Sequence, residues 1–216
     1  MNAMMKSEDF NLGQLVYGFE DRDKYLQQYA SLVSKYYKKD LDLDLVENKM
    51  DDGLEQPEQD EYIYIVRDGE RVVGGAKISF ASVELGTTLP MEEAGFSVHA
   101  YLPPDYQNPR YAEIGRLVVD PTYRGKDVLH TMVAELTEFA VQQGGGYLFV
   151  LAPALNSVLY RRVCRNLKMP IELHKDANLP DKPLYRRLDI KLLSSDIRGL
   201  YGDVAATNVG QYAIAV

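Results

Sequence analysis

The sequence predicts an α/β protein of the α+β kind, with a mixed, mostly antiparallel central sheet and helices on both of its faces. Three observations predict this class. A helical pattern and a strand hairpin come first, a long irregular connection follows, and the second half alternates strand, helix, strand, helix and strand. Such an order builds a sheet that helices cover on both sides. With 216 residues, 46% of them hydrophobic and 26% charged, the chain has the size of one globular domain with a long insertion.

We therefore expect a single domain over residues 1–216, in which composition marks three special segments. A first helix and an acidic loop occupy 20–61, an inserted link occupies 81–111, and a C-terminal tail occupies 194–216. The end of this tail is apolar, and its chain is uncharged after Asp203. It could be an added strand, an arm of a homodimer or a loose tail.

The first expected element is an amphipathic helix near 22–38. Apolar side chains recur there at the spacing of one helix face, namely Tyr25, Leu26, Tyr29, Leu32, Val33 and Tyr36. The following segment, 40–61, holds ten acids and one lysine. We expect a solvated loop or a lip that attracts an amine-bearing substrate. Nucleic acid is excluded as a partner, because binding phosphates needs a basic face.

A strand hairpin follows the acidic loop. Residues 62–66 and 71–80 are rich in β-branched and aromatic side chains, and Asp68-Gly69 supplies the turn. The pair Gly74-Gly75 indicates a bulge or a close approach of another backbone. In the long link, "LPMEEAGF" predicts a short helix and "FSVHAYL" a short strand. Connections of this length are often functional.

The second half of the chain alternates between strands and helices. We expect strands at 112–119 and 147–152, helices at 127–143 and 156–167, and a final strand or strand pair within 170–193. In the helix at 127–143, one apolar stripe is expected in the core, formed by Val128, Met132, Leu136 and Phe139.

Composition excludes several classes of protein. No run of about 18 apolar residues is present, so no membrane span is expected. The N-terminal residues do not resemble a secretory signal, which favours the cytoplasm. A single cysteine, Cys164, cannot form an internal disulfide. The histidines do not have the spacing of metal ligands, so we expect no metal.

The stretch "EIGRLVVDPTYRGKDVLHTMV" predicts an anion site. A strand ends in a turn, and a helix begins directly after it. The first N–H groups of a helix lack backbone partners, and the helix dipole adds partial positive charge there. Arg124 and Lys126 add two full charges at the same place, and Gly125 shapes the turn. The stretch is neither a P-loop nor a dinucleotide fingerprint, since both glycine patterns are absent.

In this stretch the sequence resembles the GNAT superfamily of acyl-CoA N-acyltransferases. The part "LVVDPTYRGKDV" is similar to the family's pyrophosphate motif, with Asp127 and Leu129 where glycines usually stand. The resemblance implies that a pantetheine arm pairs with Leu117, Val118 and Val119. It also implies that phosphates meet the segment made by Arg124, Gly125, Lys126, Asp127, Val128 and Leu129. An Asp127 side chain acting as helix cap would compete for the same N–H groups.

Two further motifs carry the resemblance. "NSVLYRRVC" is similar to the family's next motif, which implies that Asn156 binds the donor and that Tyr160 protonates the leaving thiolate. "AEIGRLVV" resembles the strand that carries a glutamate base, which implies that role for Glu113. The implied reaction is direct transfer of an acyl group, most simply acetyl, from acyl-CoA to an amine. The alternatives are a core position for Tyr160 and a structural ion pair with Arg116 for Glu113.

The chain also resembles acyl-homoserine-lactone synthases and N-acyl amino acid synthases. They share the fold and carry Glu-x-x-Arg on this strand, matched by Glu113 and Arg116, which implies that Arg116 binds substrate. Such synthases take acyl groups from acyl carrier protein. A basic helix face could bind that acidic partner or could simply be solvated; it is formed by Arg161, Arg165 and Lys168. A third hypothesis is a binding module without catalysis, which is favoured by the absence of glycines at positions 127 and 129.

The spacing of Glu113 and Arg116 leads to a structural prediction. Residues three apart in a regular strand face opposite sides of the sheet. Both can face one site only if a β-bulge between them resets the alternation, and Gly115 is a suitable position for it. A bulge would also splay this strand from the next one and open a slot for the pantetheine arm.

Overall fold

A computed structural model describes residues 15–19, 22–44, 60–92, 95–104, 106, 110–125 and 127–200 of the chain. The strands are β1 (Val16–Gly18), β2 (Glu61–Asp68), β3 (Arg71–Ser82), β4 (Arg110–Val119), β5 (Tyr147–Pro153), β6 (Glu172–His174) and β7 (Ile190–Asp196). The helices are α1 (Arg22–Leu41), α2 (Val128–Gln142), α3 (Ala154–Asn166) and α4 (Pro183–Leu188), with 3₁₀ turns η1 (Val98–Tyr101) and η2 (Pro121–Tyr123).

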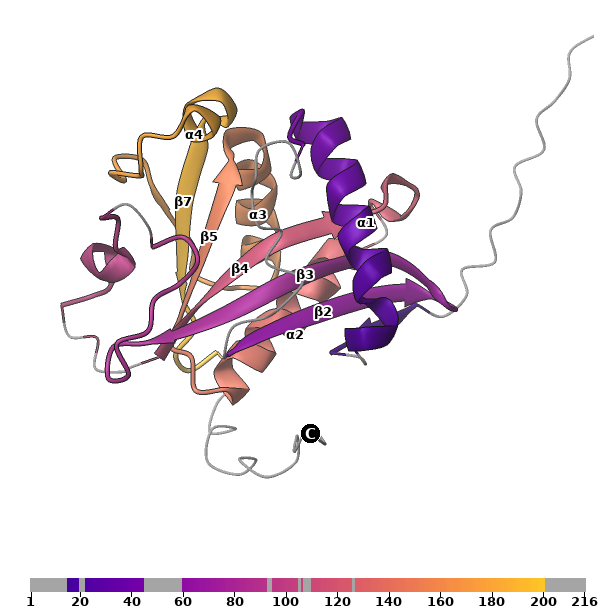
Figure 1. The fold of residues 1–216 in the computed structure, drawn as a ribbon. Helices are drawn as coiled ribbons and strands as arrows, with labels where there is room; N and C mark the ends of the chain where they lie inside the picture. Colours follow the sequence, from indigo (N-terminus) through magenta and orange to yellow (C-terminus); the bar gives the residue numbers. More distant parts are fainter. Residues whose placement is uncertain are drawn as a thin grey trace, which may run out of the picture.

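The strands form one sheet in the order β1-β2-β3-β4-β5-β7-β6, and the pair β4–β5 is parallel while the other neighbours are antiparallel (Figure 1). Alternating side chains of β2 pack on opposite faces. Ile63 and Ile65 join the cluster of α1, whereas Tyr64 and Val66 join the cluster of α2 and α3. The predicted class is therefore confirmed, with α1 on one face of the sheet and α2 and α3 on the other.

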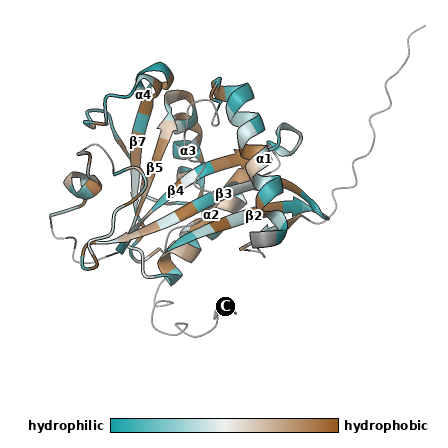
Figure 2. Ribbon diagram, viewed as in Figure 1, coloured by the Kyte–Doolittle hydropathy of each residue, from teal (hydrophilic) through white to brown (hydrophobic). Residues whose placement is uncertain are grey.

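Helix α1 forms along the predicted stripe. Tyr29 and Val33 are fully buried, and Tyr25 and Tyr36 are at most 5% exposed. These rings cover the apolar strands, while the outward face of the helix is hydrophilic (Figure 2). Gly75 explains how close the helix comes to the sheet, because a Cβ there would lie 2.7 Å from the Tyr29 ring and from the backbone oxygen of Tyr64. The expected close approach is confirmed.

The second half of the chain follows the predicted order. In α2, Val128, Met132 and Leu136 are at most 1% exposed, as the predicted stripe requires. Phe139 is only partly buried, and its ring lies against Phe19 with 3.9 Å between centroids. The segment 170–193 gives the strand pair β6 and β7, with α4 inserted between them. Strand β1 was not predicted, because three residues are too few to show a period.

Several predicted boundaries are wrong. The segment "FSVHAYL" contains the 3₁₀ turn η1 in place of a strand, since the Ser97 side chain accepts from the His99 N–H and caps a turn. The link is shorter than 81–111, because β3 extends to Ser82 and β4 begins at Arg110. Strand β7 continues to Asp196, so the first residues of the predicted tail belong to the sheet.

Some predictions fall outside the described residues. These are most of the acidic loop (45–59), two residues of "LPMEEAGF" (93–94) and the end of the tail (201–216). Within "LPMEEAGF", Leu89 to Glu92 form a turn that is closed by the Glu92 N–H on the Leu89 carbonyl at 2.8 Å.

Candidate active site

Strand β4 contains the predicted bulge. Its pairing with β3 is regular as far as Lys77↔Gly115 and resumes at Gly75↔Val118. A single residue of β3 therefore faces two residues of β4, Arg116 and Leu117, which is a β-bulge. Arg116 has a φ of 52°, in the left-handed region. The bulge is confirmed, but the residue with the unusual conformation is Arg116 and not Gly115.

The bulge changes which side chains share a face of the sheet. Ile114 packs with α2 and α3, so the preceding Glu113 faces α1. After the bulge, Val118 belongs to the cluster of α1. The Arg116 guanidinium lies 5.9 Å from the ring centre of Tyr37 on α1. Glu113 and Arg116 therefore face the same side, although they are three residues apart.

The same strand separates from its parallel neighbour. Pairing between β4 and β5 consists of Ala112↔Leu148 and Glu113↔Phe149, and these described strands diverge beyond it (Figure 1). A small pocket of about 30 Å³ lies in the opening, on the side of α2 and α3. It is lined mostly by apolar groups, among them Leu117 of β4, Val150 of β5 and Tyr160 of α3. The predicted splayed strand pair is confirmed.

Glu113 lies at the point where the two strands part. Its Oε2 accepts a hydrogen bond from the Met91 N–H at 2.9 Å. Burial raises the pKa of this carboxyl to about 7, although the Met91 N–H and the charges of Lys77 and Arg116 act in the opposite direction. A carboxyl with a pKa near neutrality can accept a proton from an attacking group and release it again.

A buried ion pair on the same face was missed at the sequence level. Lys77 Nζ lies 2.7 Å from Glu61 Oε1, and the Ser79 hydroxyl donates to the same oxygen at 2.8 Å. Both charged side chains are at most 10% exposed. The register places Ser79 beside Glu113. A lysine at an inward position of an apolar strand was the signal that could have revealed this pair.

Two tyrosines approach the opening from different helices. Tyr160 of α3 lines the pocket, and burial raises the pKa of its hydroxyl, with a smaller contribution from Tyr37. The pKa of Tyr37 is also raised by burial, while Arg116 lowers it and Glu113 raises it. Tyr37 thus lies close enough to Glu113 and Arg116 to feel their charges, and it also affects the pKa of Tyr160, which lines the pocket on the side of α2 and α3. Tyr37 was missed because the helical pattern gave only its neighbour Tyr36 an inward position.

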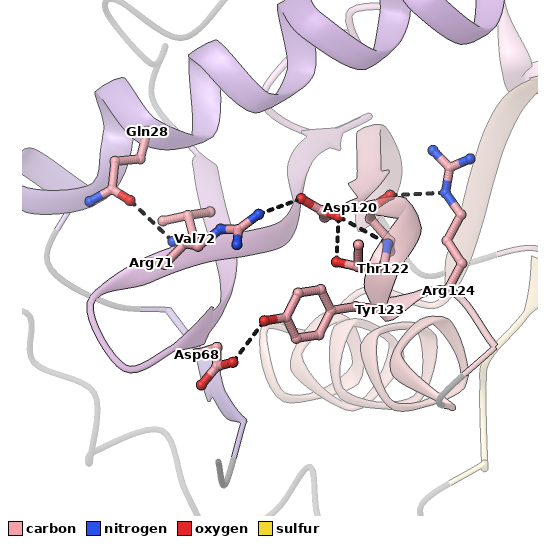
Figure 3. Close-up of polar contacts among 9 residues, drawn as sticks. Gln28, Asp68, Arg71, Val72, Asp120, Thr122, Tyr123 and Arg124 are labelled. Carbon is pink, nitrogen blue, oxygen red and sulfur yellow. Dashed lines mark hydrogen bonds and ion pairs between the residues drawn. The ribbon is translucent and has the colours of Figure 1, made fainter. Parts of the chain in front are cut away.

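The turn between β4 and α2 is fixed by side chains (Figure 3). The Asp120 carboxylate accepts from the Thr122 N–H at 3.0 Å and from its hydroxyl at 2.7 Å, and it pairs with Arg71 at 2.8 Å. The Tyr123 hydroxyl donates to Asp68 at 2.7 Å. These bonds join the turn to the β2–β3 hairpin and hold the start of α2 in place.

The Arg124 side chain is held by partners within the protein. Its Nε donates to the Val119 carbonyl at 3.0 Å (Figure 3), and its Nη2 pairs with Asp40 at 2.5 Å. The guanidinium also lies 5.6 Å from the ring centre of Tyr36. Gly125 has a φ of 80°, a conformation that favours glycine. Lys126 lies outside the described residues.

Asp127 occupies the N-cap position of α2, but its side chain does not act as the cap. Asp127 precedes α2 with a φ of 57°, and its side chain makes no capping hydrogen bond. Only its carbonyl takes part, accepting from the Thr131 N–H at 2.9 Å. Val128 is buried and Leu129 is partly buried against the core. These residues can therefore offer a ligand their backbone N–H groups, and the Asp127 carboxylate does not compete for them.

Helix α3 exposes a face that is apolar at its start and basic further on. Asn156 is exposed in the first turn, beside three exposed apolar side chains, Leu155, Val158 and Leu159. Arg161 and Arg165 are exposed further along the helix, and the Arg165 Nε donates to the Arg161 carbonyl at 3.2 Å. Lys168 was expected on the same helix face but lies after the end of α3, in a turn where its φ is 57°, so it is exposed beside the helix and not on it. Cys164 is buried, and burial raises the pKa of its thiol to about 11, as suits a core position.

Neither a metal cluster nor a membrane-crossing helix is found in the described part of the chain. No cluster of three or more His, Cys, Asp or Glu side chains is arranged to hold a metal ion among these residues. In the same part of the chain, no helix combines the length and the apolar character that a membrane crossing requires.

The sequence matches the model of the Acetyltransferase (GNAT) family over residues 26–164. No curated protein sequence matches the chain. Among solved structures, an acetyltransferase of the GNAT family from Staphylococcus aureus Mu50 is similar with a TM-score of 0.56 at 11% identity. The similarity covers 85% of this chain and 99% of that one.

Two other solved structures are similar to a comparable degree. FeeM, an N-acyl amino acid synthase from uncultured soil microbes, has a TM-score of 0.57 at 14% identity, covering 89% of this chain and 97% of its own. PaiA N-acetyltransferase from Thermoplasma acidophilum, in complex with coenzyme A, has a TM-score of 0.55 at 10% identity. The similarity covers 84% of this chain and 98% of that one. At such low identity, these likenesses show the shared fold.

Proposed function

Because the chain belongs to the GNAT acetyltransferase family, we propose that it transfers an acyl group, in the simplest case acetyl, from acyl-CoA to the amine of a small molecule. The observation that carries this proposal is the position of Glu113. It lies where β4 and β5 part, on the same face as Arg116, with a pKa of about 7. A proton acceptor thus stands at the mouth of a slot that can hold an extended donor.

The donor would lie in the opening between β4 and β5. Its pantetheine arm can pair like a strand with the edge formed by Leu117, Val118 and Val119, since the ladder to β5 ends before them. Backbone N–H groups of this edge would polarise the thioester carbonyl. The phosphates would meet the start of α2, where unpaired N–H groups and the helix dipole favour anions. Asn156 at the start of α3 would contact the arm.

In the reaction, Glu113 would take the proton from the amine as the amine attacks the thioester carbon. Tyr160 would give a proton to the departing thiolate, because it lines the slot beside Leu117. Most of the rate enhancement would come from holding donor and acceptor together, and proton transfer would contribute less. Arg116 would orient the acceptor from the same face as Glu113.

A second candidate is a synthase that acylates an amino acid, with acyl carrier protein as donor. The pairing of a base, Glu113, with a cation, Arg116, on one face suits an acceptor that carries both an amine and a carboxylate. The exposed α3 face, apolar at its start and basic at Arg161 and Arg165, with Lys168 just after the helix end, suits an acidic carrier protein. The first candidate is preferred because family membership points to acetyl transfer.

A thermal-shift panel tests the donor, since a ligand that binds the native state raises the melting temperature. The panel contains acetyl-CoA, hexanoyl-CoA, octanoyl-CoA and acylated carrier protein. Turnover is then measured with matched acceptors, for example tyrosine against tyramine. A higher melting temperature with acetyl-CoA, together with turnover of amines, supports the first candidate. A rise only with acylated carrier protein supports the second, and no rise with any donor leaves a binding module without catalysis.

A further inference from the structure

The link between β3 and β4 reaches into the candidate site. Met91 is 2% exposed, and its N–H donates to the Glu113 carboxylate at 2.9 Å. The neighbouring Leu89 is also 2% exposed and packs in one cluster with Tyr111 and Phe149. A segment between two strands of the sheet therefore supplies the one hydrogen bond found on Glu113 within the described residues.

One side chain of the link, Glu92, accepts four hydrogen bonds. Its Oε2 accepts from the Leu89 N–H at 2.9 Å and from the Tyr111 hydroxyl at 3.0 Å. Its Oε1 accepts from the Ser97 hydroxyl at 2.9 Å and from the Val98 N–H at 3.1 Å. Bonds to an ionised acceptor are stronger than bonds between neutral groups. Glu92 therefore fixes both the Leu89–Glu92 turn and η1 to strand β4.

These bonds determine where the Met91 N–H points. The turn Leu89–Glu92 is closed by the Glu92 N–H on the Leu89 carbonyl at 2.8 Å, and Pro90 suits its second position. The Glu92 side chain closes the same turn a second time through the Leu89 N–H. Met91 lies between these anchors, so the direction of its N–H depends on Glu92.

We propose that Glu92 is a positioning residue for the candidate base: through the Leu89–Glu92 turn, it holds the Met91 N–H on the Glu113 carboxylate. The inference rests on the proposed function, in which Glu113 takes the proton of the amine. Glu92 itself touches neither substrate nor reacting atoms. Its effect is to keep Glu113 oriented and to favour the ionised form that can accept a proton.

The direction of the effect follows from the surroundings of Glu113. Lys77, Arg116, Glu61 and Tyr37 are the charged or titratable groups that face it from β3, β4, β2 and α1. None of them changes when Glu92 is substituted. Loss of the negative charge of Glu92 would by itself lower the pKa of Glu113, so a rise reports the displaced hydrogen bond, and Tyr111→Phe, which keeps that charge, isolates it. The Met91 N–H favours the ionised carboxylate, so its displacement raises the pKa of Glu113 above about 7. At neutral pH a smaller fraction of the base would then be ionised.

The test measures the titration of Glu113 directly. Full-length protein is labelled with ¹³C at the glutamate side-chain carboxyl, and the Glu113 signal is assigned by its loss in Glu113→Gln. Glu92→Gln keeps the size of the side chain but replaces one acceptor oxygen with a donor. Tyr111→Phe keeps the ring and removes one bond. Glu84→Gln, at an exposed position of the same link, is the matched control.

We expect the Glu113 titration midpoint to rise by about half a unit to one unit in Glu92→Gln and by less in Tyr111→Phe. It should stay unchanged in Glu84→Gln. An unchanged midpoint in folded Glu92→Gln, even with a lower melting temperature, overturns the proposal. If Glu92→Gln does not fold, Tyr111→Phe decides in the same way.

Activity separates this proposal from the proposed function. For an active enzyme, the acid limb of kcat/KM should move to higher pH together with the Glu113 midpoint, and activity should recover above it. A shifted midpoint without any turnover by the wild type supports the positioning role while the proposed function fails. A shifted acid limb with an unshifted midpoint overturns the positioning role and leaves the proposed function intact.

Discussion

Glu113 and Arg116 lie three residues apart on β4, yet both face α1, because Arg116 adopts a left-handed conformation within a bulge. A non-glycine residue pays about 1–2 kcal/mol for this conformation. We therefore expect Arg116→Gly to be more stable than Arg116→Ala by about 1 kcal/mol, against the usual preference of strands for alanine. Urea unfolding measures the difference. The same two substitutions at the exposed Glu172 of β6 are the control, where alanine should be the more stable variant.

The raised pKa of Glu113 predicts opposite effects on activity and stability. Glu113→Gln should lower kcat by about 10²-fold or more and abolish the acid limb near pH 7. A carboxyl whose pKa is higher in the folded protein destabilises it where the group is ionised. This penalty is absent below the pKa of the unfolded chain, about 4.3, and is complete above about 7.

Glu113→Gln should therefore be more stable than the wild type at pH 8, by roughly 1–3 kcal/mol, and equally stable near pH 4. Unfolding curves of both proteins across this pH range measure the gain. A gain that does not depend on pH would show that the carboxyl titrates normally in the folded protein.

Tyr160→Phe tests the proposed proton donor. The ring and its packing remain, so the melting temperature should change little. A thiol is a good leaving group, and loss of the general acid should lower kcat by roughly 10–100-fold, with little change in the donor Kd. The opposite pattern, a loss of stability with unchanged kcat, would assign Tyr160 to the core alone.

The Asp40–Arg124 ion pair predicts that two substitutions change donor binding in opposite directions. Arg124→Ala should raise the Kd of acetyl-CoA by about 10-fold, because a charged contact to phosphate is lost. Asp40→Asn should lower it by a few-fold, since an exposed ion pair that holds the arginine elsewhere contributes only about 0.2–1 kcal/mol. Calorimetry at low salt measures both values. Weaker binding by Asp40→Asn would contradict a competition between Asp40 and the donor.

The close contact of α1 with the sheet predicts different tolerance at two glycines. Gly75→Ala should lower the free energy of unfolding by about 1–3 kcal/mol, because the new methyl group meets the Tyr29 ring and the Tyr64 carbonyl. Gly115→Ala serves as the comparison, since only a Glu113 oxygen at 3.5 Å lies near its Cβ position. Equal losses of unfolding free energy in Gly75→Ala and Gly115→Ala would mean that α1 can move away from the sheet.

The order of elements could be predicted from the sequence because it depends on local patterns. The stripe of α1 and the stripe of α2 repeat at the helical period, and the strands of the hairpin are continuous runs of β-forming residues. Strand β1 and turn η1 escaped prediction because three or four residues do not define a period. Strand β7 exceeded its predicted end because its last residues pair with β5, a partner far away in the chain.

The sequence by itself determined the elements, their order, and the need for a bulge if Glu113 and Arg116 share a site, since all of these follow from periodicity and spacing. Only the tertiary structure decided that Arg116 takes the left-handed conformation, that Asp40 holds Arg124, and that Met91 binds Glu113. The physical reason is that these contacts join segments between 22 and 84 residues apart. Their formation depends on how helices and links pack on the sheet, which local patterns do not specify.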